Sequence, residues 1–196
     1  MSSQRQATVK RETKETRIEL TLNIDGVGAS EISTGIGFLD HMLGSLAKHA
    51  HFDLKLQCDG DLEIDDHHTA EDCALSLGQA FDQALGERKG ITRFGSAFAP
   101  LDEALARAVV DFSGRPYSDI ALGFRREQIG TIATENLTHV MQSFATAARI
   151  TLHVDVLKGE NDHHRAEAAF KAMALALRIA CRTDGTNSVP STKGIL

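Results

Sequence analysis

The residues best suited to chemistry lie in two copies of one motif. The first copy, DHHTAE, begins at Asp66, and the second, DHHRAE, begins at Asp162. Imidazole nitrogens and carboxylate oxygens are good ligands for transition metals. Residues four apart lie on one face of a helix, so the first histidine and the glutamate of each motif can share one ion. These pairs are His67 with Glu71 and His163 with Glu167.

Each motif also has a second histidine, His68 or His164. Adjacent helical residues diverge by about 100°, so this second histidine must point away from the first. A further histidine lies upstream of each motif, His41 in HMLGSLAKHAHFDLKL and His139 in HVMQSFATAARITLHV. Exchange of the second histidines between the motifs gives each ion three histidines and one glutamate. We predict one set of His67, Glu71, His139 and His164, and another of His163, Glu167, His41 and His68.

Four protein ligands leave open positions on an octahedral ion, and open positions indicate catalysis. The ligand types suit manganese, iron or zinc and do not choose among them. Histidine-rich patches are most often solvated surface, but the repetition of the whole arrangement argues against that here. We expect His51 and His153 to be structural or exposed, and His49, which follows His41 along the same predicted helix, to be structural or to line the pocket.

The repeated segments indicate a duplicated chain, with half-repeats at residues 1–92 and 93–196 in one compact domain. Apolar residues alternate with polar ones from Ile18 to Ile24, which predicts a half-buried strand. We predict two more strands around Leu54–Leu56 and Leu62–Ile64, separated by a turn at Cys58–Gly60. In the second half, ARAVVDFSG, YSDIALGF and ITLHVDV are strand-like. The predicted fold is α+β, two layers with a sheet covered on one face by helices.

The bulk composition excludes several classes of protein. Of the 196 residues, 42% are hydrophobic and 24% are charged, as in a globular protein. A formal net charge of −6 gives no basic surface for nucleic acid. No apolar run is long enough to cross a membrane, and the N-terminus has no secretory apolar segment. Three cysteines without a CxxC motif fit a reducing cytoplasm.

Six motifs in order resemble imidazoleglycerol-phosphate dehydratases, from about Thr8 to the C-terminus. They are GIGFLDHML at 35–43, DDHHTAED at 65–72, RFGSAFAPLDEA at 93–104, SGRPY at 113–117, HHRAEAAFKA at 163–172 and PSTKG at 190–194. The resemblance implies a hydro-lyase of histidine biosynthesis that converts imidazole glycerol phosphate to imidazole acetol phosphate. It also implies a fold related to ribosomal protein S5 domain 2, and two manganese ions held by the six histidines and two glutamates above. It further implies a shell of 24 subunits with shared sites.

The same resemblance implies roles for individual residues. Glu15 would reach the substrate from a neighbouring subunit as acid or base, and the other catalytic residues would be Glu71, Glu167 and Lys171. The substrate-binding set would be Glu15, His41, His49, Arg93, Arg115, Ser191, Thr192 and Lys193. Within it, Arg93, Arg115, Ser191 and Lys193 resemble the phosphate-binding residues. One position departs from the family, because Ser45 stands where many members carry Gln.

Three other functions are compatible with parts of the sequence. A dinuclear hydrolase could use the same ligands, but it would not need the six ordered motifs. A metal-binding protein without turnover would not need phosphate-anchoring cations near the C-terminus. A small-molecule kinase could share the general fold, but the chain lacks a Gly/Ser-rich phosphate loop.

Overall fold

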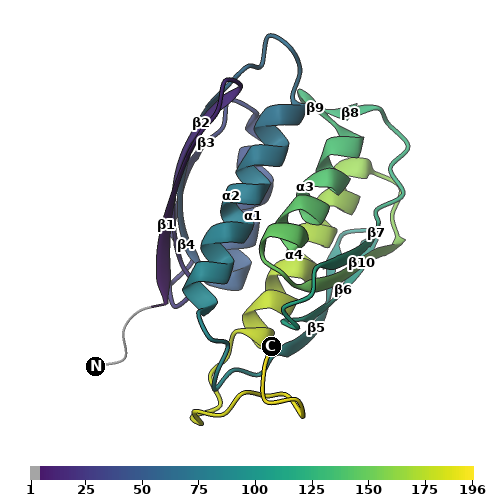
Figure 1. Cartoon of the computed structure of the whole chain (residues 1–196). Helices are drawn as coiled ribbons and strands as arrows, with labels where there is room; N and C mark the ends of the chain where they lie inside the picture. Colours follow the sequence, from purple (N-terminus) through teal and green to yellow (C-terminus); the bar gives the residue numbers. More distant parts are fainter. Residues whose placement is uncertain (1–4) are drawn as a thin grey trace.

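The computed structural model describes residues 5–196, and its first half forms a sheet with two helices (Figure 1). The elements of this half are β1 (Gln6–Glu12), β2 (Thr16–Asn23), β3 (Ser30–Ser33), α1 (Gly37–Ala50), β4 (Asp53–Gly60) and α2 (His67–Leu85). The strand order is β1-β2-β4-β3, with β3 parallel to β4 and the other pairs antiparallel. Ile18, Leu20 and Leu22 of β2 are buried and alternate with more exposed residues, which confirms the predicted half-buried strand.

The second half repeats this arrangement. Its elements are β5 (Phe94–Leu101), β6 (Ala104–Asp111), β7 (Tyr117–Ala121), β8 (Gln128–Ile129), β9 (Ile132–Ala133), α3 (Thr134–Ala147), β10 (Thr151–Lys158) and α4 (Asp162–Ala180). The main sheet has the order β5-β6-β10-β7, and again only its last pair, β10 with β7, is parallel. Strands β8 and β9 form a small separate hairpin that leads into α3.

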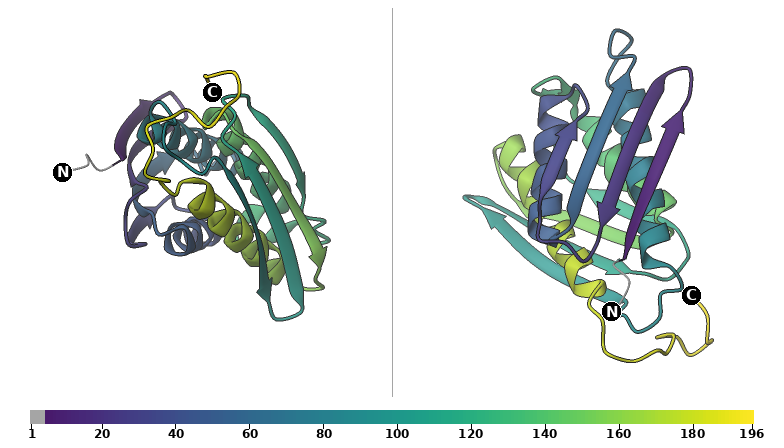
Figure 2. Two further views of the ribbon diagram at one scale, coloured as in Figure 1. Left: turned by 90° about the horizontal axis from the view of Figure 1, so that it is seen from below. Right: turned by 90° about the vertical axis from the view of Figure 1, so that its left-hand side faces the viewer.

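The helices of the two halves pack against each other between the two sheets (Figures 1 and 2). The predicted two-layer sheet-and-helix fold is therefore present in each half, and the whole chain has the layer order sheet, helices, helices, sheet. Helix α2 lies against α3, and α1 lies against α4. Phe81 of α2 is fully buried and contacts Phe112 and Phe144 of the second half, so one core joins both halves.

The predicted strand around Leu54–Leu56 is present in β4, but the predicted turn at Cys58–Gly60 and the strand at Leu62–Ile64 are wrong. Strand β4 continues through Cys58 to Gly60, because these residues pair with the long strand β2. The chain then turns towards α2, and Leu62 and Ile64 are exposed in the connecting segment. Strands β1, β3, β5, β8 and β9 lie outside the strands that the sequence predicted. Among the residues 5–196, no helix combines the length and apolar character that crossing a membrane requires.

The approach of α2 to α3 depends on a glycine and gives a testable prediction. A Cβ on Gly78 would lie 2.6 Å from the carbonyl oxygen of Phe144 and 2.7 Å from the Ala147 Cβ, whereas a Cβ on Gly44 of α1 would meet only the Ser30 hydroxyl, at 3.7 Å. Gly78→Ala should lower the free energy of unfolding by about 1–3 kcal/mol because it overpacks this contact.

Gly44→Ala is the matched control, because it removes a helical glycine where space is available. It should raise the free energy of unfolding by about 0.5–1 kcal/mol. Urea unfolding followed by circular dichroism measures both variants. Stabilisation by both substitutions would show that α2 and α3 are not in tight contact.

Candidate metal centre

The first cluster of candidate ligands lies where α2 meets α3. It consists of His67 and Glu71, one helical turn apart on α2, and His139 of α3, each with a ligand atom within 4.8 Å of the others. The His139 Nε2 lies 3.0 Å from the Glu71 Oε1, and the His67 and His139 rings stack with centroids 5.0 Å apart. These are three of the four ligands that the sequence predicted for one ion.

Asn136, which the sequence analysis missed, holds the His67 ring. Its Oδ1 is 2.9 Å from the His67 Nδ1, and its Nδ2 donates to the Asp66 Oδ2 at 3.0 Å. This contact leaves the His67 Nε2 for a cation. Asn136 precedes His139 by three residues on α3, but its polar side chain alone gave no signal of this role in the sequence.

The second cluster lies where α1 meets α4 and consists of His41, His163 and Glu167. The Glu167 Oε1 lies 2.9 Å from the His41 Nε2 and 3.0 Å from the His163 Nε2. Its other oxygen, Oε2, lies 2.6 Å from the Nζ of Lys171, which places this predicted active-site lysine beside the cluster. These are again three of the four predicted ligands.

The carboxylate of Glu167 is strongly favoured in its charged form. Burial raises its pKa, but hydrogen bonds from Lys171, His41 and His163 outweigh burial and lower the pKa to about 2. Glu167 is therefore an anion throughout the neutral pH range, as a metal ligand must be.

The remaining two predicted ligands, His68 and His164, lie outside both clusters of their own chain. The Nδ1 of His68 is 3.0 Å from the Asp61 Oδ2, and the Nδ1 of His164 is 2.7 Å from the Glu103 Oε2. These hydrogen bonds raise the pKa of each histidine. In both rings the carboxylate orients Nδ1, and Nε2 is left for another partner.

Two further predicted residues lie near these histidines. Glu15 follows the first strand of the β1–β2 hairpin, and its Oε1 is 3.8 Å from the His68 Nε2. His49 lies two turns beyond His41 on α1, where burial and the positive charge of Lys171 lower its pKa. His49 is thus on the side of α1 that faces α4.

The donor sets fit a divalent transition-metal ion. Each cluster offers two imidazole nitrogens and a carboxylate oxygen, all close enough to one another to bind a single ion. Such mixed nitrogen and oxygen sets suit manganese, iron or zinc. The glutamate of each cluster also bonds a histidine from the other half of the chain.

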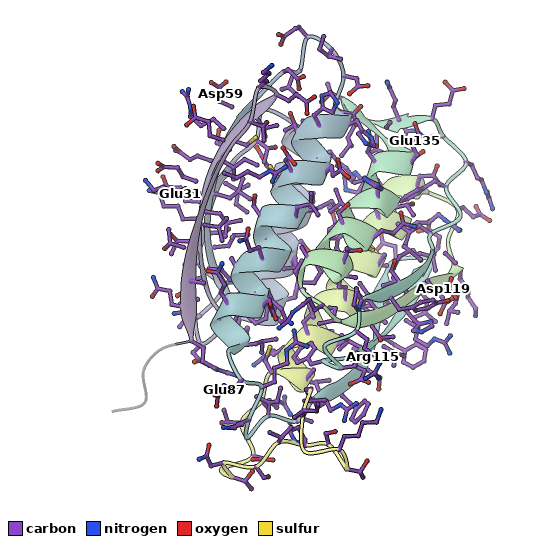
Figure 3. All side chains as sticks on the ribbon, in the orientation of Figure 1. Glu31, Asp59, Glu87, Arg115, Asp119 and Glu135 are labelled. Atoms are coloured by element: carbon purple, nitrogen blue, oxygen red, sulfur yellow. The ribbon has the colours of Figure 1, made fainter. Side chains whose placement is uncertain are left out.

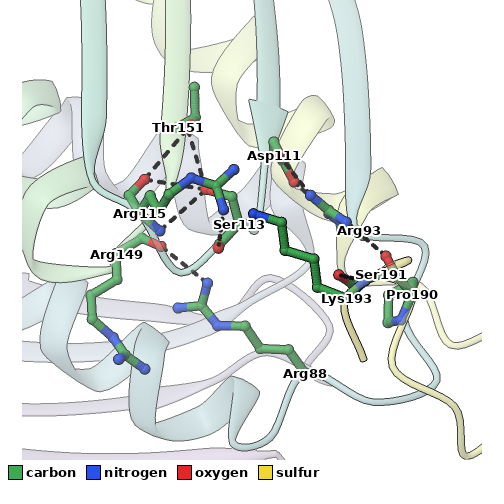
Figure 4. Close-up of polar contacts among 10 residues, drawn as sticks. All are labelled: Arg88, Arg93, Asp111, Ser113, Arg115, Arg149, Thr151, Pro190, Ser191 and Lys193. Carbon is green, nitrogen blue, oxygen red and sulfur yellow. Dashed lines mark hydrogen bonds and ion pairs between the residues drawn. The ribbon is translucent and has the colours of Figure 1, made fainter. Parts of the chain in front are cut away.

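The predicted phosphate-binding residues gather near the C-terminus (Figure 4). Arg93 donates to Asp111 at 2.7 Å and to the carbonyl of Pro190 at 2.7 Å, which ties β5 to the tail. A Cβ on Gly114, in the turn before Arg115, would lie 2.7 Å from the carbonyl carbon of Leu196, so the tail also touches this turn. The backbone N–H of Lys193 donates to the Ser191 hydroxyl, with Thr192 between them.

Buried Arg88 holds the same end of the molecule together, and the sequence analysis did not identify it. It is 2% exposed and donates to Asp82 and to the carbonyls of Ala148 and Arg149. Figure 4 shows the contact with Arg149. Arg88 thereby joins the segment after α2 to the segment after α3. Near the C-terminal ends of α2 and α3, the two halves are thus connected by hydrogen bonds as well as by apolar packing.

Metal clusters and phosphate-binding residues lie at opposite ends of the helices. His67 opens α2, whereas Arg93 follows its end, and the helix has 19 residues. At 1.5 Å per residue α2 is about 28 Å long. In Figure 3, Asp59 lies near the end of the molecule where α2 begins, and Glu87 lies near the opposite end, where α2 stops. Within one chain, therefore, the two groups cannot contact one small molecule.

Comparisons with known proteins agree with this geometry. The family model for imidazoleglycerol-phosphate dehydratase matches residues 34–177. An imidazoleglycerol-phosphate dehydratase of Phytophthora nicotianae is 62% identical over 100% of this chain, which spans 43% of that protein. One from Candida glabrata is 55% identical over 97% of this chain and 99% of its own length.

Two solved structures share the fold. The enzyme of Pyrococcus furiosus, in complex with (S)-C348, matches with a TM-score of 0.83 and 37% identity, over 96% of this chain and 100% of its own. That of Staphylococcus aureus matches with a TM-score of 0.82 and 35% identity, over 91% and 99%. The chain therefore belongs to the imidazoleglycerol-phosphate dehydratase family, hydro-lyases of histidine biosynthesis.

Proposed function

We propose that this chain dehydrates imidazoleglycerol phosphate to imidazole acetol phosphate with two bound manganese ions. The observation that carries the proposal is the pair of clusters, each with two imidazoles and one carboxylate within 4.8 Å. When bound, the ions would polarise the imidazole ring of the substrate, which would help hydroxide leave the carbon beside the ring while a proton is lost from the next carbon.

The fourth ligand of each ion would come from a neighbouring copy of the chain. His164 would complete the His67 cluster, and His68 would complete the His41 cluster. Support comes from the carboxylates that bond the Nδ1 of both rings, since a histidine whose Nδ1 is bonded to a carboxylate presents its Nε2 to a cation. Neither histidine reaches a cluster of its own chain.

Glu15 would act as acid or base in the neighbour that receives His68. The His68 and Glu15 side chains lie 3.8 Å apart, so a neighbouring site that His68 completes would also contain Glu15. A carboxylate can accept the proton from carbon and return it to the departing hydroxyl. Glu71 and Glu167 would hold the ions, and Lys171 would provide a cation beside Glu167.

The phosphate end of the substrate would bind to Arg93, Arg115, Ser191, Thr192 and Lys193. Arginine forks and backbone N–H groups near a glycine suit phosphate oxygens. The substrate, an imidazole ring with three carbons and a phosphate, is far shorter than α2. The metal ligands and the phosphate-binding residues of one site would therefore come from different copies of the chain. His41 and His49 would contact the substrate beside the second ion.

The outer face of the second sheet offers a surface for such assembly. Phe94, Phe98 and Tyr117 are more than half exposed there, on β5 and β7. The outer face of the first sheet carries ion pairs such as Lys10–Glu19 and Lys55–Glu31, whereas the second sheet carries these three rings with the Arg107–Asp155 ion pair beside Phe98. Exposed apolar patches mark contacts between proteins. We propose that this face meets other copies in a large homo-oligomer, of 24 subunits as the resemblance implies.

We also place the protein in the cytoplasm. Its three cysteines, Cys58, Cys73 and Cys181, form no disulfide in the structure. Unbridged thiols are typical of reducing compartments.

Turnover tests the proposed reaction. Chelator-treated protein should form the keto product from imidazoleglycerol phosphate only after manganese is added. Glu71→Ala and Glu167→Ala should each lower kcat at least about 100-fold, because removing a ligand costs more than disturbing its support. The control is His51→Asn, which changes a histidine outside both clusters and keeps its left-handed backbone favourable. Absence of product with any divalent metal would contradict the proposal.

Light scattering tests the proposed assembly surface. Phe98→Glu replaces one of the exposed rings on the outer face of the second sheet with a charge, and it should reduce the mass of the particle in solution. Thr8→Glu places the same charge on the outer face of the first sheet and should leave the mass unchanged. An unchanged mass for Phe98→Glu would show that this face is not an interface.

A further inference from the structure

The two clusters come from equivalent segments of the repeat, but their surroundings differ. Asn136 precedes His139 by three residues, and the residue at the same place before His41 is Phe38. Asn136 is 5% exposed and accepts the hydrogen bond from the His67 Nδ1. Phe38 instead lies edge-on to the His163 ring, with centroids 5.0 Å apart. Asn136 therefore holds the His67 ring by a hydrogen bond at Nδ1, whereas the contact of Phe38 with the His163 ring is apolar.

Asn136 is itself fixed from the other side. Its Nδ2 donates to Asp66, and the same Asp66 oxygen accepts the backbone N–H of Ala133. Asp66 is the first residue of the DHHTAE motif, so the motif supplies both the ligand and the anchor of its support. This chain of hydrogen bonds keeps the proton of His67 on Nδ1 and the lone pair on Nε2.

The glutamates also differ, because only Glu167 of the second cluster has a lysine one helical turn beyond it. Glu167 already shares its Oε2 with the ammonium of Lys171, at 2.6 Å. The position equivalent to Lys171 in the first half is Leu75, so Glu71 has no ammonium one turn beyond it. A cation that enters the His41 cluster therefore finds one carboxylate oxygen occupied and a positive charge beside it. Like charges at this separation repel and weaken binding.

We propose that Asn136 is a positioning residue and that the two clusters fill in order, His67–Glu71–His139 first and His41–His163–Glu167 second. This inference rests on the proposed two-ion function and goes beyond it, because it ranks two sites that the repeat makes formally equivalent. Outer partners of metal ligands change affinity by about 10- to 100-fold. The two dissociation constants should therefore differ by at least about tenfold.

Manganese titration of the chelator-stripped full chain measures the order directly. Free Mn²⁺ is followed by the electron paramagnetic resonance signal of the aqueous ion. The unsubstituted chain should bind two ions per chain in two steps. His139→Ala should lose the tight ion, and His41→Ala should lose only the weak one. Two equal affinities, or loss of the tight ion in His41→Ala, would overturn the order.

Two further variants test the cause. Asn136→Ala should weaken the tight step about 10- to 100-fold and leave the weak step unchanged. Lys171→Leu reproduces Leu75 and should strengthen only the weak step, so the second arm remains informative if Asn136→Ala fails to fold. No change of the tight step in a folded Asn136→Ala would contradict the role of Asn136. Tight binding of no ion would contradict the two-ion site itself, whereas equal binding of two ions would contradict only the order.

Discussion

The contact between the helices of the two halves is the constraint on which the site depends. Each cluster takes a histidine and a glutamate from the second helix of one half, and a histidine from the first helix of the other. The halves must therefore be held in register at the level of single side chains. Gly78 permits the close approach of α2 and α3, and Phe81 joins the two sets of core residues.

The duplication explains how one chain builds two similar sites. Exchange of one histidine between halves gives each cluster the same donor set, and substitutions have since made their surroundings different. Asn136 faces His67 where the other half has Phe38, and Lys171 binds Glu167 where the other half has Leu75. The repeat fixes the ligands, whereas the flanking residues determine how strongly each site attracts a cation.

Residue types and spacing predicted much of this arrangement. The i, i+4 relation of His67 to Glu71 places both on one helix face, and the repeat predicted the partner from the other half. The prediction of a strand at Leu62 and Ile64 was wrong, because alternating apolar residues in a connecting segment resemble a strand when their burial is unknown. Asn136 and Arg88 were missed because a hydrogen bond between distant segments leaves no periodic pattern. The separation of Arg93 from the clusters became visible only when the direction of α2 was known.

The central claim is that a complete site takes its metal end and its phosphate end from different copies of the chain. Mixing two inactive variants tests it directly: Glu71→Ala removes a metal ligand, and Arg115→Ala removes a phosphate contact. After chelator-induced dissociation and reassembly with manganese, random mixing should restore activity to up to about a quarter of the sites. These sites combine the intact end of each variant. A mixture that stays as inactive as its parents, although the two chains co-assemble, would contradict the account.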